Sequence, residues 1–362
     1  IDTQMKVSTD GIASTLVIAN AALPKAGGTM TGDLTVTNAT ATGVLSDPSG
    51  NVRSGRKNLI VNGGFDVWQR GTSFTNNNSV LFAADRYATF SNGASTTSQQ
   101  AFTLGQTDVA SNPKYYLRWD VSTYSSGDRI YQRIEDVITT SGQSVTLSYW
   151  AKAETATTMV PQATQAFGSG GSTAVTTAID SVVLTTSWQK FTRTFTLPSV
   201  SGKTIGAGSF LEVGLLRFTT SYTGYVDIAN VQLELGSVAT DFEHRSYGEE
   251  LALCQRYFNT VYEGLLGVSI GTTQGMMSWP FPVTMRVAPT VSATTDSVRF
   301  GDQIITGNTL TSMTVAATSF NSKEVAAWTM SGTASVDLVD FRPILLEPNT
   351  AAHATFTFDA EL

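Results

Sequence analysis

The residues of this sequence best suited to binding chemistry are aromatic side chains in stretches that alternate like strands. A pyranose ring packs its face on an aromatic ring, and polar neighbours hold its hydroxyls. The first group of candidates comprises Trp119, Tyr131, Trp150 and Trp188, with Arg118, Gln132 and Arg133 as polar companions. The second group comprises Tyr262, Trp279, Arg299 and Trp328. Core packing is the alternative interpretation of each aromatic residue, because a strand sequence does not show which face is exposed.

Carboxylates could instead support hydrolysis of a glycosidic bond, which needs two acids held about 5 to 10 Å apart across a cleft. The candidates are Glu135, Asp136, Glu212 and Glu234, whose spacing does not distinguish them from acids on the solvent face of strands. His244 lies in the polar run 241–245. For this run a solvated turn is favoured over a metal site or an acid–base site.

Residue counts and missing motifs exclude other chemistries. Two histidines and a single cysteine, Cys254, cannot make a His/Cys zinc site. No G-x-x-x-x-G-K-S/T phosphate loop occurs. We therefore expect that the chain is not an enzyme.

The composition favours a β-rich protein that neither binds nucleic acid nor inserts into a membrane. Charged residues make up 14% of the chain, against a usual share of about a quarter, and residues typical of strands and turns replace them. A net charge of -7 opposes binding to nucleic acid, and no apolar run approaches the length of a membrane span. The single cysteine rules out an intrachain disulfide, which is compatible with synthesis in a reducing cytoplasm.

Short strands must position the first group of candidates. Residues 57–245 are predicted to form one all-β domain, a two-sheet sandwich such as a jelly roll. The predicted strands are 58–61, 86–91, 115–121, 129–136, 144–152, 178–184, 188–196, 209–218 and 223–235. A helix is predicted at 246–258, where Ser246 and Glu249 form a capping box. Its predicted apolar stripe is Tyr247, Leu251, Cys254 and Phe258.

The two ends of the chain differ in character. Residues 259–362 return to strands and are predicted to form a small β-rich distal tip. Prolines favour an edge strand or an extended arm at 279–291, and 354–360 alternates like a closing strand. Residues 1–56 have few large apolar residues and no aromatic, so we expect a connector that shares a core with other chains or stays mobile. Because the sequence starts without Met, we expect a longer chain with a further N-terminal part.

Four blocks of sequence resemble phage tail proteins. The run GGTMTGDL at 27–34 matches a repeat of tail-fibre shafts. The run KNLIVNGGFDVWQRG at 57–71, followed by ADRY at 84–87, resembles the start of a jelly-roll module similar to the family 4 and family 9 carbohydrate-binding modules. The stretch 224–258 resembles the last strand of that module and its exit helix. The run FPVTMRVAPTV at 281–291 resembles a segment of distal fibre domains.

The resemblance implies a phage tail-fibre protein located in the virion tail and made in the cytoplasm of the bacterial host. It implies a homotrimer that contacts other tail proteins through the N-terminal part and binds a host surface polysaccharide or protein. Distal domains of fibres meet the host first, so Tyr262, Trp279, Arg299 and Trp328 are favoured as the principal receptor site. The alternatives are a virion-borne polysaccharide depolymerase and a purely architectural tail component.

Calcium is the one cofactor that the resemblance raises. Modules of this shape often hold a structural calcium near the first and last strands, where Asp66 and Asp227 lie in this sequence. Calcium takes about six to eight oxygen ligands, and the acids near these two positions are too few to supply them. We therefore expect no cofactor, with Asp66 and Asp227 as weak calcium candidates.

Overall fold

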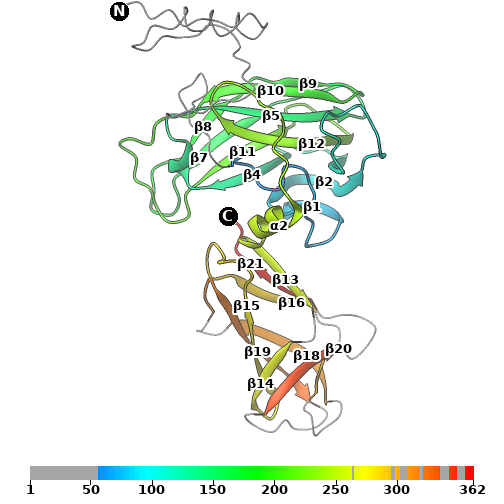
Figure 1. Cartoon of the computed structure of the whole chain (residues 1–362), viewed down its shortest axis with the longest axis vertical. Helices are drawn as coiled ribbons and strands as arrows, with labels where there is room; N and C mark the ends of the chain where they lie inside the picture. The colour runs from blue at the N-terminus through cyan, green and yellow to red at the C-terminus, as the bar shows by residue number, and fades with distance from the viewer. Residues whose placement is uncertain are drawn as a thin grey trace, which may run out of the picture. The chain divides into compact units, whose positions relative to one another are not determined.

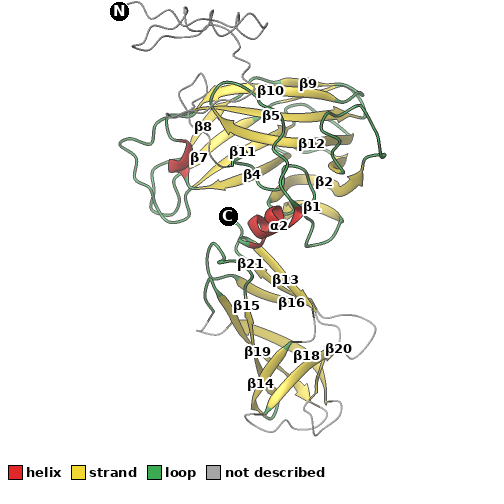
Figure 2. Cartoon of the chain, viewed as in Figure 1, coloured by secondary structure: helices red, strands yellow, loops and turns green. Residues whose placement is uncertain are grey.

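The computed structural model describes residues 56–262, 265–294, 298–301, 308–317, 321–334, 342–348 and 355–362. The predicted connector lies outside the described residues except for Arg56. Residues 53–362 form one compact unit, and the part that the structure describes is an all-β protein with short helices (Figure 1 and Figure 2). No helix among the described residues is both long enough and apolar enough to cross a lipid bilayer.

The first part of this unit is a β-sandwich made from one curled sheet, in the order β10-β5-β12-β3-β2-β4-β11-β7-β8, with β1 paired to β2. Its strands are β1 (Ser73–Phe82), β2 (Tyr87–Ala101), β3 (Tyr115–Thr123), β4 (Arg129–Glu135), β5 (Ser144–Ala153), β7 (Gln162–Ala166), β8 (Val175–Ala178), β10 (Gln189–Thr196), β11 (Phe210–Arg217) and β12 (Gly224–Leu235). A separate pair, β6 (Thr157–Met159) and β9 (Val182–Leu184), and a short 3-10 helix, Val137–Thr140, complete it. The predicted jelly-roll-like sandwich is confirmed.

The sheet curls because β2 belongs to both halves of the sandwich. Tyr87–Phe90 pairs with β4, whereas Ala94–Ala101 pairs with β3. Between these segments the backbone of β3 comes so close that a Cβ on Gly93 would lie 1.8 Å from the Thr123 carbonyl oxygen. Only glycine fits such an approach without a shift of one strand.

Alternation along each strand fills the space between the two halves. Leu117, Trp119 and Val121 of β3 point inward and are buried, whereas Tyr116 and Arg118 lie on the outer face. Apolar side chains from the other strands join them in one core, and burial of this apolar area is the main stabilising contribution.

Most predicted strands of the sandwich are present, but two are wrong. Residues 58–61 form no strand, because side chains such as Asn58 and Gln132 bind their backbone. Residues 178–184 are divided between β8 and β9. Strands β1, β6 and β7 were not predicted. In β1 the run Asn76–Ser79 interrupts the apolar alternation, while β6 and β7 are short and rich in Thr, Gln and Ala.

Helix α2 (Tyr247–Gln255) follows the sandwich and begins at the predicted cap, where the Glu249 N–H donates to Ser246 Oγ at 3.3 Å. The predicted stripe is wrong in part. Tyr247 is 60% exposed, and Phe258 lies beyond the helix in a strand. Cys254 is buried as predicted. The other buried residue of the helix is Glu250, which accepts a hydrogen bond from the Asn62 N–H and forms an ion pair with Arg245.

The last part of the unit combines a closed barrel with a small sheet. The barrel has the order β14-β15-β19-β18-β17-β20, and the sheet has the order β13-β21-β16. The strands are β13 (Phe258–Tyr262), β14 (Leu266–Gly271), β15 (Gln274–Pro280), β16 (Thr290–Thr294), β17 (Val298–Gly301), β18 (Asn308–Ala317), β19 (Val325–Ala334), β20 (Pro343–Pro348) and β21 (Thr355–Asp359). The predicted closing strand is β21, which lies in the centre of its sheet. The Pro-rich run between β15 and β16 is an irregular arm, as its prolines require.

Candidate ligand-binding face of the sandwich

Three of the predicted glycan-binding aromatics are buried, so for them the prediction is wrong. Trp119 and Trp328 are 0% exposed and Tyr131 is 1% exposed. Trp119 packs on Phe218, and Trp328 packs on Phe356 and Phe358. The guanidinium groups of Arg129 and Arg133 lie near the Tyr131 ring. A sugar cannot reach these rings. Trp119 and Trp328 point into the two cores, whereas Tyr131 shares a face of β4 with Arg129 and Arg133, which cover it.

The other candidates do not converge on one site in the distal part. Trp279 is half-buried against the core of the distal part. Tyr262 lies in β13 and Arg299 in β17, and their side chains lie outside the described part of the structure.

In the sandwich, Trp150 is half-buried on β5, and Trp188 is half-buried just before β10. Gln132 is buried, where its amide binds both the N–H and the carbonyl of Val61.

A row of three charged side chains crosses the sandwich where β3, β12 and β5 lie side by side. The register pairs Asp227 with Arg118 on one side and with Lys152 on the other. Arg118 donates from Nε and Nη2 to the two carboxylate oxygens of Asp227, at 2.8 and 2.9 Å. Lys152 Nζ lies 3.7 Å from Asp227 Oδ2. Asp227 is 0% exposed, so the two cations compensate a buried charge.

Aromatic rings surround this charged row. The ring centroids of Phe102, Tyr116 and Trp188 lie 4.7 to 5.4 Å apart, and all three side chains are half-buried. The Arg118 guanidinium lies 4.0 Å from the Tyr225 ring centroid, and Lys152 Nζ lies 5.3 Å from that of Trp188. We define the aromatic face by these side chains. It consists of Phe102, Tyr116, Arg118, Lys152, Trp188, Tyr225 and Asp227.

Two groups of the aromatic face, the Tyr116 hydroxyl and the Arg118 guanidinium, keep their protons at neutral pH. Burial raises the pKa of the Tyr116 hydroxyl, and the Asp227 carboxylate adds to this effect. The hydroxyl therefore stays protonated and can donate a hydrogen bond. The hydrogen bonds to Asp227 raise the pKa of the Arg118 guanidinium, which remains charged. The face thus offers ring surfaces beside fixed hydrogen-bond donors.

The sequence identified part of this face. Trp188 and Arg118 were predicted as an aromatic candidate and a polar companion, whereas Phe102, Tyr116 and Tyr225 were missed. The alternation in β3 contained a usable signal, because Tyr116 and Arg118 share a face opposite to the apolar Trp119. The contributions of β5 and β12 depend on strand register, which a single sequence does not show.

The two weak calcium candidates have different surroundings. Arg118 donates hydrogen bonds to both carboxylate oxygens of Asp227. Burial raises the pKa of Asp66, although Lys114 and His244 oppose the shift. Among the residues that the structure describes, no group of three or more His, Cys, Asp and Glu side chains could hold a metal ion.

The four acids considered for hydrolysis have structural contacts. Glu135 Oε2 lies 2.8 Å from Arg256 Nη2, and Glu212 Oε2 lies 3.1 Å from Arg133 Nε. Asp136 caps the 3-10 helix and accepts a hydrogen bond from Ser209 at 2.6 Å. Glu234 accepts hydrogen bonds from Thr240 at 2.8 Å. Each carboxylate is thus engaged by the protein itself.

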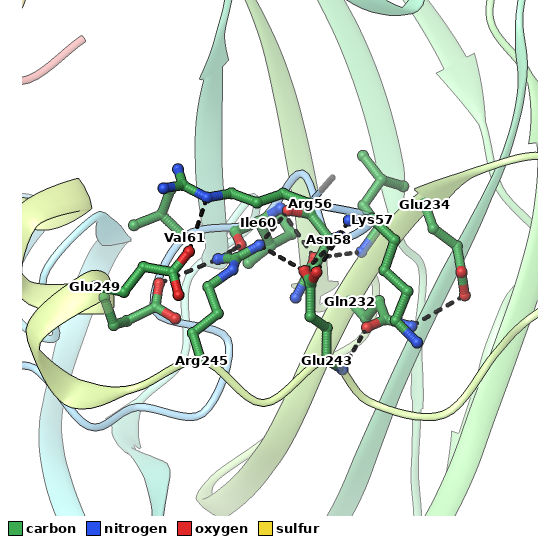
Figure 3. Close-up of polar contacts among 12 residues, drawn as sticks. Arg56, Lys57, Asn58, Ile60, Val61, Gln232, Glu234, Glu243, Arg245 and Glu249 are labelled. Carbon is green, nitrogen blue, oxygen red and sulfur yellow. Dashed lines mark hydrogen bonds and ion pairs between the residues drawn. The ribbon is translucent and has the colours of Figure 1, made fainter. Parts of the chain in front are cut away.

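A second polar cluster joins the two ends of the sandwich segment (Figure 3). We call it the collar, and it consists of Lys57, Asn58, Glu243, Arg245 and Glu250. Glu243 accepts the N–H groups of Lys57 and Asn58 at 3.1 and 2.9 Å. Arg245 binds the carbonyls of Asn58 and Ile60, and both glutamates, with a side chain that is only 4% exposed.

The collar corrects the prediction of a solvated turn at 241–245. His244 is exposed and its ring contacts Phe242 edge-on, but Glu243 and Arg245 are held inside the collar. Burial acts to raise the pKa of Glu243, but the backbone N–H groups of residues 57 and 58 together with Arg245 outweigh it and lower that pKa. The charged form is therefore stabilised, as a structural ion pair requires.

No protein-family model matches this chain, and no curated protein matches it. Solved structures with partial similarity include the enzymatically active domain of tailspike protein 4 of bacteriophage CBA120, at 16% identity and a TM-score of 0.29, covering 49% of this chain and 21% of that one. The CBM22-2 xylan-binding domain of Paenibacillus barcinonensis Xyn10C has 13% identity and a TM-score of 0.31, covering 42% and 92%. The Stig cyclase Fisc from Fischerella sp. TAU has 13% identity and a TM-score of 0.34, covering 51% and 98%.

This chain therefore spans about a fifth of the tailspike domain that it resembles. The names of the three structures carry different activities.

Proposed function

We propose that this chain is a phage tail-fibre protein whose sandwich binds a glycan of the bacterial envelope through the aromatic face. The observation that supports this proposal is the group of half-buried rings around the Arg118–Asp227–Lys152 row. Rings that keep part of their surface accessible can stack on a pyranose, and neighbouring cations can donate to its hydroxyls. The shaft-like run at 27–34 supports the tail-fibre part of the proposal.

The proposal moves the principal site from the distal tip to the sandwich. In the described residues of the tip, Trp328 is fully buried and Trp279 packs on the core. The sandwich, in contrast, brings together accessible aromatic and charged groups from β3, β5 and β12. The proposed partners are two further copies of the chain and a host polysaccharide, and the proposed location is the virion tail.

The aromatic face is tested with Trp188→Ala and Tyr116→Ala. The full-length chain is applied to an array of purified bacterial lipopolysaccharides and capsular polysaccharides. Loss of one stacking ring is expected to weaken binding by about tenfold, which corresponds to about 1.4 kcal/mol. The control is Tyr247→Ala, which removes an aromatic side chain that is 60% exposed at the start of α2, and it should bind as the parent does.

Three outcomes contradict the proposal. Equal affinity of Trp188→Ala, Tyr116→Ala and Tyr247→Ala would show that the aromatic face does not bind the glycan. Absence of binding on the array and on intact host cells would favour a purely architectural component. A fall in polysaccharide chain length during incubation would favour the depolymerase instead of a binding protein.

A further inference from the structure

The segment that follows β21 lies against three arginines of the sandwich. Arg86 Nη1 forms an ion pair with Glu361, and Arg70 Nη2 lies 3.3 Å from both Glu361 Oε1 and Asp359 Oδ2. Arg133 Nη1 donates to the carbonyl of Leu362 at 2.6 Å. We call residues 359–362 the clasp.

These contacts are nearly removed from solvent. The side chain of Arg86 is 2% exposed, that of Glu361 is 5% exposed and that of Arg70 is 12% exposed. A charge buried to this extent is strongly unfavourable without its partner. Arg86 also has a φ of 72°, a left-handed conformation that costs energy in a residue with a Cβ and persists only where packing demands it.

The same two arginines contact the beginning of the distal part. The Arg86 guanidinium lies 3.4 Å from the centroid of the Tyr257 ring, and that of Arg70 lies 3.5 Å from the Phe258 ring. Phe258 is the register partner of Asp359 in the sheet of β13 and β21. Tyr257 and Phe258, where the distal part begins, and Asp359 of β21 therefore contact the same two arginines of the sandwich.

Side chains on the distal side hold the clasp from the opposite direction. Arg286 donates from Nε to the carbonyl of Ala360 at 2.8 Å and from Nη2 to that of Glu361 at 2.7 Å. The Ala360 N–H donates to the Tyr257 carbonyl at 2.8 Å. Arginines of the sandwich and of the distal part thus hold the clasp from both sides.

We infer that the clasp locks the distal part to the sandwich, so that the two move as one rigid body while it is seated between Arg70, Arg86 and Arg286. Without it, the two parts would keep the contacts of Gln69 with the Phe258 carbonyl and of Glu135 with Arg286, and the short connection from α2 into β13 could act as a hinge. The inference does not depend on glycan binding, because the aromatic face shares no residue with the clasp.

The test uses spin labels in the full chain at Val183→Cys in the sandwich and Met276→Cys in the barrel, which are 58% and 36% exposed in the parent. Cys254 is buried and stays unlabelled. Pulsed electron paramagnetic resonance measures the distance between the labels. The parent should give one narrow distribution, and Glu361→Gln should broaden it, because Arg86 and Arg70 lose their shared carboxylate. Asp359→Asn should broaden it less, because Arg86 keeps Glu361.

The matched control is Glu249→Gln, which breaks an exposed pair with Arg56 and should leave the distribution narrow. Each variant is also checked by near-ultraviolet circular dichroism, where an unchanged spectrum shows that the aromatic core of the sandwich is folded. A narrow distribution that survives in Glu361→Gln and in Arg70→Gln overturns the inference. A distribution already broad in the parent overturns it as well.

Discussion

At the scale of single residues, the fold buries ionisable side chains, so that their protonation affects the stability of the folded chain. Asp85 is 1% exposed, accepts hydrogen bonds from Gln69 and lies 3.8 Å from Arg70. Burial raises the pKa of Asp85 from 3.8 to about 6, and Arg70 and Gln69 offset only part of this shift. Asp85 therefore binds its proton more tightly in the folded chain than in the unfolded chain.

The sign of the resulting pH dependence follows directly. The stability contributed by protonated Asp85 is fully present below pH 3.8 and is lost as the pH rises through about 6. The difference amounts to about 3 kcal/mol across this window. Asp85→Asn stays neutral throughout, so its thermal unfolding midpoint should change less than that of the parent between about pH 5 and about pH 8. Identical pH profiles for the two proteins, followed by calorimetry, would contradict this account.

Residue type and exposure were predictable to different degrees. The sequence of β3 identifies both Trp119 and Arg118 as notable, but only the observed face separates a core residue from a surface residue. Asp227 illustrates the same limit, because its sequence position suggested a metal ligand while its cross-strand neighbour Arg118 makes it an ion-pair partner. Contacts across strands depend on register, and register is a property of the folded sheet.

At the scale of elements, the collar explains how a segment without strand structure can be well ordered. Residues 58–61 were predicted as a strand from their apolar content. The side chain of Asn58 instead accepts the Ile60 N–H, Arg245 donates to the Ile60 carbonyl, and Gln132 accepts the Val61 N–H. Helix α2 was easier to predict, because its cap depends on local spacing alone.

The collar predicts a large loss of stability for Arg245→Met. The substitution leaves the Glu243 and Glu250 carboxylates and the Asn58 and Ile60 carbonyls without their shared donor, at an expected cost of about 3 to 5 kcal/mol. Arg56→Met removes an exposed pair with Glu249 and should cost less than about 1 kcal/mol. Urea unfolding of both variants measures the difference. Similar losses in the two would show that the collar is no more important than a surface ion pair.

At the scale of the whole molecule, the all-β class and the sandwich followed from composition and from the spacing of strands. The single curled sheet and the closed distal barrel did not, because both depend on pairings between strands distant in sequence, such as β5 with β12 and β14 with β20. The sparse segment 1–56 remains a predicted connector that shares its core between chains.

The proposed trimer makes a prediction about mass. Light scattering on the full chain at neutral pH should give about three times 38.5 kDa. Three copies of the aromatic face would then engage a repeating glycan together, and weak single contacts would gain avidity where the spacing allows. A single species of 38.5 kDa would contradict assembly through this chain and leave a monomeric binding module.

The collar also determines how the protein responds to mechanical tension. It bonds Lys57 and Asn58 directly to Glu243 and Arg245, where the chain passes into and out of the sandwich. A pull along the chain is therefore transmitted across these bonds, which share it in parallel, and the strands between them are shielded from it. We therefore expect the aromatic face to keep its shape under tension until the collar ruptures. Rupture of the collar followed by unfolding of the sandwich would release residues 59–242, roughly 600 Å of extended chain.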